Sequence, residues 1–122
     1  MKTHTPGPWK ILPEEVGRDY IRVRGTVYGT RFKIANVLHP GSTHPDDDSQ
    51  TRANARLIAA SPELLQELEK AHRIISNALN LMTSEQKRNW ANANARDGVD
   101  GEGITRATER EAVIAKTKGV DA

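Results

Sequence analysis

Apolar and basic residues alternate in three short segments near the start of the chain. These are WKIL (residues 9–12), YIRVR (residues 20–24) and RFKIANVL (residues 31–38). Successive side chains of an extended strand point to opposite faces, so each segment is expected to be apolar on one face and basic on the other. A glycine-rich stretch at residues 25–29 favours a turn between the last two segments. The pattern predicts an antiparallel β-meander of three or four strands.

A helical pattern follows the loop HPGSTHPDDD (residues 39–48), which is broken by prolines. Helices are predicted at residues 49–60, 62–82, 84–96 and 104–118. Ser61 is placed to cap the second helix, with Pro62 at its first helical position. Thr83 and Gln86 form the pattern of a capping box before the third helix.

The predicted fold class is therefore α+β. A β-meander of residues 1–38 precedes a bundle of three or four helices at residues 49–118. A length of 122 residues favours one domain, so a single domain is predicted over residues 1–122.

The helix predicted at residues 62–82 is apolar on more than one side. Its heptad-like seam contains Leu64, Leu68, Ala71, Ile75, Ala78 and Met82. Further apolar residues lie off this seam: Leu65, Ile74, Leu79 and Leu81. A helix that is apolar on two sides needs two partners. One partner is expected to be the sheet, and the other either a later helix or a second copy of the chain, which predicts a homo-oligomer, at least a dimer.

Composition narrows the function classes. The chain has no cysteine, which excludes disulfides, thiolate nucleophiles and zinc–thiolate sites. It shows no nucleophile-elbow, P-loop or zinc-protease motif, so no enzyme activity is predicted. The absence of a long apolar run and of a signal peptide predicts no membrane partner and a location in the cytoplasm. A net charge of +2 does not call for a polymeric nucleic acid, but suits a small anion at a local basic site.

A metal site is not predicted. His39, His44 and Asp46–Asp48 are possible ligands, yet their loop is broken by prolines and their spacing fits no known metal pattern. The turn DGVDGEG (residues 97–103) lacks oxygen ligands at the alternating positions that a calcium loop needs. No cofactor is predicted either.

The segment KRNWANANARDGVDGEGITRATER (residues 87–110) combines side chains that suit a nucleotide. Asn89 and Asn92 share a helix face, and an asparagine amide can pair with an adenine edge. Trp90 offers a stacking surface. Arg106 and Arg110 share another helix face, and guanidinium groups match phosphate oxygens.

An alternative for this segment remains open. Trp90 is also consistent with a core position, and the asparagines with solvated positions. The arginines are equally suited to ion pairs with Glu102, Glu109 and Glu111.

The predicted sheet offers further candidates. Its basic face would carry Arg22, Arg24, Arg31 and Lys33, near Lys10; these side chains are also consistent with a solvated outer face. On the first helix, Arg52 and Arg56 either pair with the Asp46–Asp48 run or face a pocket. The full set of candidate ligand-binding residues is Arg24, Arg56, Met82, Asn89, Trp90, Asn92, Arg106 and Arg110.

Three motifs carry a resemblance to known proteins. HTPGPW (residues 4–9), IANV (residues 34–37) and ANARLIAASPELLQELEKA (residues 53–71) resemble a motif set in small phage and prophage proteins. In size and motif order the chain resembles the phage Thoeris anti-defence protein one family. That resemblance implies a phage protein that binds cyclic ADP-ribose isomers, and for some members cyclic oligonucleotides of CBASS systems. It further implies sequestration without cleavage, assembly as an oligomer of dimers, and a ligand pocket in the C-terminal half.

Two other function classes remain possible on the sequence. A phage accessory protein that binds and inhibits a host protein would use the apolar surface of the long helix. A nucleic-acid-binding protein would use the basic face of the sheet, against which the small net charge argues.

Overall fold

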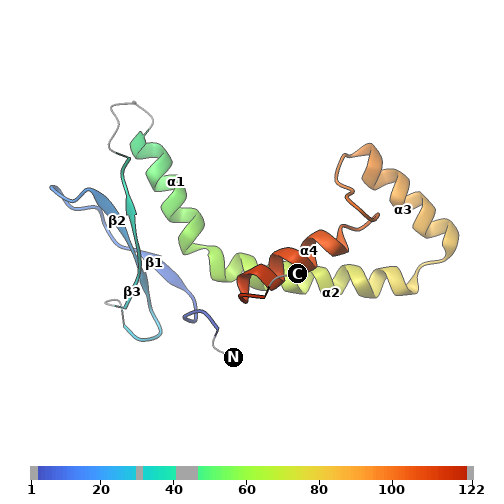
Figure 1. The fold of residues 1–122 in the computed structure, drawn as a ribbon, viewed down its shortest axis with the longest axis horizontal. Helices are drawn as coiled ribbons and strands as arrows, with labels where there is room; N and C mark the ends of the chain where they lie inside the picture. The colour runs from blue at the N-terminus through green and yellow to red at the C-terminus, as the bar shows by residue number, and fades with distance from the viewer. Residues whose placement is uncertain (1–2, 30–31, 41–46, 121–122) are drawn as a thin grey trace. The chain divides into compact units, whose positions relative to one another are not determined.

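The computed structural model describes residues 3–29, 32–40 and 47–120, except for the side chain of Asp47 (Figure 1). Its elements are β1 (Trp9–Ile11), β2 (Tyr20–Gly25), β3 (Lys33–Leu38), α1 (Asp47–Ala59), α2 (Ser61–Leu81), α3 (Ser84–Arg96) and α4 (Ala107–Thr117). The predicted α+β class is confirmed, with three strands and four helices in the described part of the chain.

The described residues fall into two compact units, Met1–Leu64 and Leu65–Ala122. That both belong to one domain, as the sequence predicts, stays a prediction.

The first unit is an antiparallel sheet in the order β1-β2-β3, with α1 packed on all three strands (Figure 1). Ile21 and Val23 of β2 are buried on the covered face, together with Ala55 of α1. The apolar face predicted from the alternation is thus confirmed at these positions. β-Branched side chains suit a half-buried pleated surface, which favours a strand at these positions.

The basic face differs from the expected solvated surface at one position. Arg24 retains only 6% of its exposure. Its guanidinium donates to three neutral oxygens: Val23 O (2.9 Å), Ala35 O (3.0 Å) and Asn36 Oδ1 (2.9 Å). The solvated alternative is therefore wrong for Arg24, because its side chain lies across the neighbouring strand instead of extending into water. Arg31 lies outside the described residues.

The HTPGPW segment packs against the start of α2. Trp9 Nε1 donates to Thr5 O at 3.1 Å, and Thr26 Oγ1 donates to Pro8 O at 2.8 Å. A β-carbon on Gly7 would lie 2.9 Å from Pro62 Cβ, which is closer than real β-carbons approach. Two of the motifs that carry the resemblance therefore meet in space.

Helix starts follow the sequence in one case and differ in another. Thr83 caps α3 by accepting from the Gln86 N–H. The Thr83 N–H donates to the Gln86 side-chain oxygen, which completes the predicted capping box. The predicted cap at Ser61 is wrong. Its hydroxyl donates to Leu57 O at 3.0 Å, in the last turn of α1. Only Ala60 separates α1 from α2, so Ser61 still lies within reach of a carbonyl of α1.

The second unit contains the rest of α2 with α3 and α4. None of the described residues from 65 to 120 is buried. Ile74 keeps 66% of its exposure, Leu81 85% and Val113 52%. The helices of this unit therefore leave apolar surface uncovered. No helix in the described ranges combines the length and apolar character that a bilayer crossing requires.

Candidate functional site

A polar contact joins α4 to α2 in the second unit. Arg110 Nε donates to His72 Nδ1 at 3.1 Å, and Arg110 Nη1 donates to Thr105 O. A guanidinium can only donate, so His72 Nδ1 accepts and the ring proton lies on Nε2. That nitrogen is 3.5 Å from Glu111 Oε1. These two contacts, one at each ring nitrogen, fix the orientation of the imidazole between the two helices.

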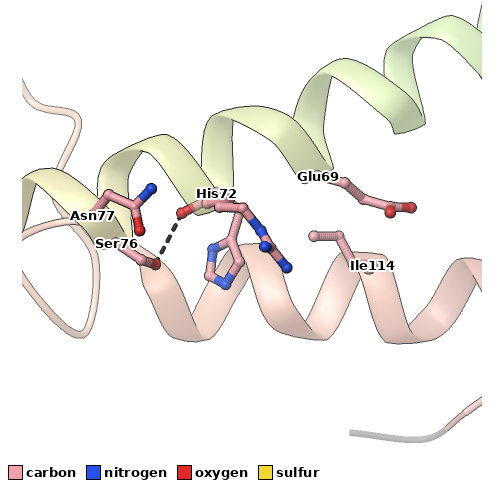
Figure 2. Close-up of a pocket in the computed structure, with 6 residues that line it drawn as sticks. Glu69, His72, Ser76, Asn77 and Ile114 are labelled. Atoms are coloured by element: carbon pink, nitrogen blue, oxygen red, sulfur yellow. Dashed lines mark hydrogen bonds between the residues drawn. The ribbon is translucent and has the colours of Figure 1, made fainter.

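Beside this contact lies a groove of about 440 Å³ (Figure 2). It is lined by Glu69, His72, Arg73, Ser76, Asn77 and Ile114. Ser76 Oγ donates to His72 O at 2.9 Å, so its proton is already engaged. Arg73 and Asn77 are exposed, and Ile114 supplies an apolar wall from α4. The groove thus offers cationic, amide, hydroxyl and apolar contacts.

The loop between α3 and α4 is built around Glu109. Glu109 Oε2 accepts from the Glu102 N–H at 3.0 Å and lies 3.6 Å from Arg106 Nη1. Arg106 Nη1 also donates to Asp100 O at 3.0 Å. Hydrogen bonds from the Glu109 and Glu102 amides, opposed by partial desolvation, lower the pKa of the Glu109 carboxyl, with help from the Arg106 and Arg110 charges. A β-carbon on Gly101 would lie 1.5 Å from Glu109 Oε2, so any larger residue there would have to displace this carboxylate.

The structure gives the two predicted phosphate-binding arginines internal partners. Arg106 donates to Asp100 O in the loop before α4, and Arg110 donates to His72 of α2. The alternative of ion pairs is right for Arg106 with Glu109. Glu111 Oε1 lies 3.5 Å from His72 Nε2 and not beside either arginine in the described contacts, and Glu102 contributes its backbone amide. Arg110 Nη2 is buried without a hydrogen-bond partner in the described part of the chain.

The other candidates from the helices lie apart from the groove. Asn89 and Asn92 are exposed on α3, and Trp90 and Met82 are half-buried. None of these four lines any of the three grooves described here. Asn94, the third asparagine of the segment, donates to Ile104 O at 2.7 Å and holds the loop.

Sequence reasoning missed the polar residues of α2 that form the groove. Glu69, Arg73, Ser76 and Asn77 follow one another at intervals that place them along one side of a helix. A polar stripe at spacings of three and four within an otherwise apolar helix was the available signal.

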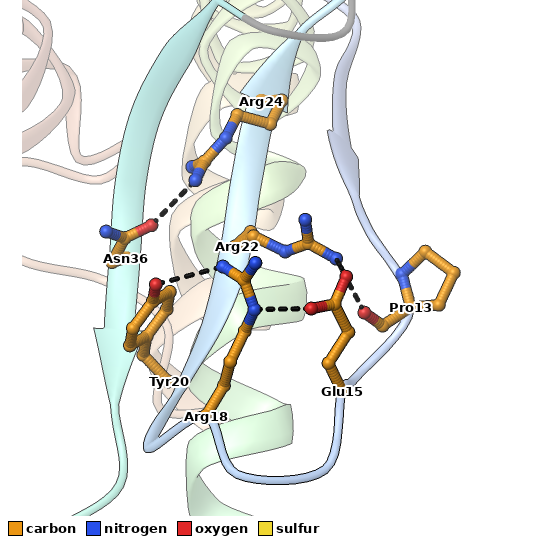
Figure 3. A network of polar contacts seen from close by, with 7 residues as sticks. All are labelled: Pro13, Glu15, Arg18, Tyr20, Arg22, Arg24 and Asn36. Atoms are coloured by element: carbon orange, nitrogen blue, oxygen red, sulfur yellow. Dashed lines mark hydrogen bonds and ion pairs between the residues drawn. The ribbon is translucent and has the colours of Figure 1, made fainter.

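In the first unit, three arginines have acidic partners among the described residues: Arg18, Arg22 and Arg52. Glu15 accepts from Arg18 Nε at 2.5 Å and from Arg22 Nη2 at 3.0 Å, and Arg18 Nη1 also donates to Tyr20 Oη (Figure 3). The Arg18 hydrogen bond, against a smaller desolvation effect, lowers the pKa of Glu15. Arg22 also donates to Pro13 O. Glu15 thus compensates part of the positive charge of Arg18 and Arg22 near the β1–β2 connection.

The two candidate arginines of α1 differ in their surroundings. Arg52 donates from Nε and Nη2 to both oxygens of Glu14, at 2.9 and 3.2 Å. This hydrogen bond lowers the pKa of Glu14 and raises that of Arg52, to which the charge of Asp48 also contributes. Asp46 lies outside the described residues. Arg56 lines two shallow grooves of about 310 and 500 Å³ between α1 and β1, as the pocket alternative expects.

The residues considered for a metal are only partly described. His39 Nδ1 lies 3.2 Å from Asp48 Oδ1, while His44 and Asp46 are outside the described ranges. Among the described residues, no three histidine or acidic side chains are grouped so that they could hold an ion.

The family described as Salmonella phage P22 protein Y8K6 matches residues 1–121 of the chain. The chain belongs to this phage protein family. The match spans both compact units. Comparisons with curated proteins and with solved structures found no match.

Proposed function

We propose that this member of the phage family captures a small cyclic nucleotide immune signal and holds it without cleaving it. The proposed ligand is a cyclic ADP-ribose isomer, with cyclic oligonucleotides as possible further ligands. The observation that carries the proposal is the groove between α2 and α4, whose volume of about 440 Å³ falls within the size range of small-molecule sites. Such a protein would act in the host cytoplasm, where the signal is made.

The lining of the groove suits the parts of a nucleotide. Arg73 presents a planar fork that matches phosphate oxygens. Asn77 can pair with a base edge, and Glu69 can accept from a ribose hydroxyl. Ile114 offers apolar surface to a base or sugar. These are binding groups, and the Ser76 hydroxyl donates to a backbone carbonyl instead of to a general base.

The proposal includes a homo-oligomer, a dimer or an oligomer of dimers. The second unit has no buried residue among those described, yet Ile74 and Leu81 expose large apolar side chains. A second copy would cover this surface and deepen the open groove. Asn89, Trp90 and Asn92 on α3 are then candidates for contacts with a ligand held between copies.

The test is a capture experiment with a defined ligand. The protein is incubated with cyclic ADP-ribose isomers, separated from free ligand, and heat-denatured, and the released nucleotide is identified by mass spectrometry. Intact nucleotide supports sequestration. A degraded nucleotide indicates an enzyme, and no released nucleotide contradicts the proposal. Arg73→Ala should weaken capture by about tenfold or more, whereas the exposed Lys70→Ala on the same helix should not.

A second candidate function is inhibition of a host protein through the apolar surface of α2. The exposures of Ile74 (66%) and Leu81 (85%) favour it. A host protein that binds the wild type but not Ile74→Lys, with no cyclic nucleotide captured by either, would favour this function over sequestration.

A further inference from the structure

Three basic residues lie side by side across the three strands of the sheet. Lys10 of β1 is the direct partner of Arg24 in β2, and Arg24 is the direct partner of Lys33 in β3. Directly opposed residues project from the same face, with β-carbons about 4.5–5.5 Å apart. We call Lys10, Arg24 and Lys33 the basic row.

A β-bulge creates the second half of the row. Val23 pairs with Ala35, whereas Arg24 pairs with Lys33, so the register shifts between Val23 and Arg24. Without this shift, Arg24 would face Ile34. A bulge re-aims the side chains beside it, and here it aligns a third positive charge with the other two.

The basic row has no acidic partner among the described residues. Arg24 is 6% exposed, and every oxygen to which it donates is neutral (Figure 3). Lys10 and Lys33 are exposed, and neither forms an ion pair in the described part of the chain. By contrast, the adjacent Arg22 lies 3.0 Å from Glu15 on the same sheet.

This arrangement costs stability unless an anion binds. Like charges directly opposed across strands repel each other. The first unit also contains the net positive charge of the chain, because residues 1–64 contain nine Lys and Arg against seven Asp and Glu, whereas residues 65–122 contain nine of each. A row of three uncompensated cations, with the central one held rigidly by neutral acceptors, has the features of an anion-binding surface.

We propose that the basic row is a second binding site, which takes a linear chain of phosphate groups. Two strand spacings give the row a length of roughly 10 Å, which suits an oligophosphate better than one phosphate ion. The flexible Lys10 and Lys33 ammonium groups would bind the phosphates from the two edge strands, and the buried Arg24 guanidinium would attract the middle of the chain through its charge. The site does not depend on the proposed function of the groove in the second unit.

Tripolyphosphate is the probe that tests the site. Isothermal titration should show binding to the wild type, weakened at least about tenfold in Lys10→Gln/Lys33→Gln. The control Lys70→Gln/Lys116→Gln loses the same charge from the second unit and should bind like the wild type. Lys10→Arg/Lys33→Arg should retain binding. Raising the salt from about 50 mM to about 200 mM should weaken binding in the wild type.

Thermal unfolding gives a second readout that needs no ligand. At low salt, Lys10→Gln/Lys33→Gln should melt above the wild type because repulsion along the row is removed, and tripolyphosphate should raise the melting temperature only of proteins that keep the row. Equal affinities of the wild type and Lys10→Gln/Lys33→Gln would overturn the proposal, as would an equal loss in the control.

The source of the phosphates is distinguished by two further titrations. Equal affinity for tripolyphosphate and adenosine triphosphate would support a site that contacts the phosphates alone. Tighter binding of the nucleotide would support the same site with an added contact to the base. Row-dependent binding of single-stranded oligothymidylate without binding of tripolyphosphate would overturn the assignment to a small phosphate chain.

Discussion

Arg110 of α4 donates to His72 of α2 across 3.1 Å, from Nε to Nδ1. The two residues are 38 positions apart in the chain. Because no described residue from 65 to 120 is buried, apolar packing alone does not fix how α4 lies on α2. This hydrogen bond therefore contributes strongly to the position of α4 relative to α2, the two helices that line the groove.

Removing either partner should loosen the second unit. Arg110→Ala and His72→Ala should each lower the free energy of unfolding, and the double variant should lose less than the sum. A coupling free energy of about 0.5–1.5 kcal/mol is expected from a double-mutant cycle in urea. Asn80→Ala, an exposed substitution on α2, is the control. Strict additivity of the two single variants would contradict a direct interaction.

The loop at residues 97–106 should depend on the ionised Glu109 carboxylate. The pKa of Glu109 is lowered below its ordinary value of 4.5 in the folded protein. A lowered folded pKa means that the stabilisation is complete above the ordinary value and is lost as the pH falls through the folded pKa. Acidification below 4.5 should therefore release the Glu102 amide, measured as faster hydrogen exchange. Glu109→Gln should remove this pH dependence.

Gly101→Ala tests the same contact from the other side. The new β-carbon would displace the Glu109 carboxylate from the Glu102 amide, so the Glu109 pKa measured by NMR should rise toward its ordinary value. Gly103→Ala, where a β-carbon meets nothing, should leave it unchanged.

The capping box of α3 should be measurable on its own. Thr83→Ala removes the side chain that accepts from the Gln86 amide at 3.2 Å. The expected loss is about 1 kcal/mol of stability, together with fraying of the first turn seen by hydrogen exchange. Ser84, beside it, has no side-chain hydrogen bond among the described contacts, so Ser84→Ala should change little. Equal effects of both substitutions would argue against the cap.

The close approach of the N-terminal segment to α2 predicts intolerance at Gly7. Gly7→Ala would bring a β-carbon to 2.9 Å from Pro62 Cβ, so one of the two segments must move. A loss of about 1–3 kcal/mol is expected. It can be measured by denaturation monitored through tryptophan fluorescence in a Trp90→Phe background, in which Trp9 is the remaining tryptophan. A variant as stable as the wild type would show that the segment is loosely held.

The exposed apolar surface of the second unit predicts self-association. In sedimentation velocity the wild type should be larger than one 13.5 kDa chain. Ile74→Lys should shift the population toward monomer, whereas Val16→Lys, at a fully exposed position of the first unit, should not. Sedimentation of the wild type as a monomer at all concentrations would contradict the homo-oligomer.

The elements of the fold were predictable because local patterns determine them. Alternation over YIRVR placed β2, and the Thr83–Gln86 box placed the start of α3 at the residue where it begins. The exceptions were also local: Ser61 donates backward to α1 because the break between the helices is too short for a separate cap.

The binding surfaces were not predictable in the same way. The sequence supplied arginines, but whether each is free depends on what the fold brings beside it. Arg52 meets Glu14 and Arg110 meets His72, each 38 positions away. The sequence by itself determined which segments become strands and helices, since period and cap chemistry act over a few residues. Only the tertiary structure decided which charges are neutralised and which stand together, because strand register, one bulge and the packing of α4 on α2 join residues that no local pattern connects.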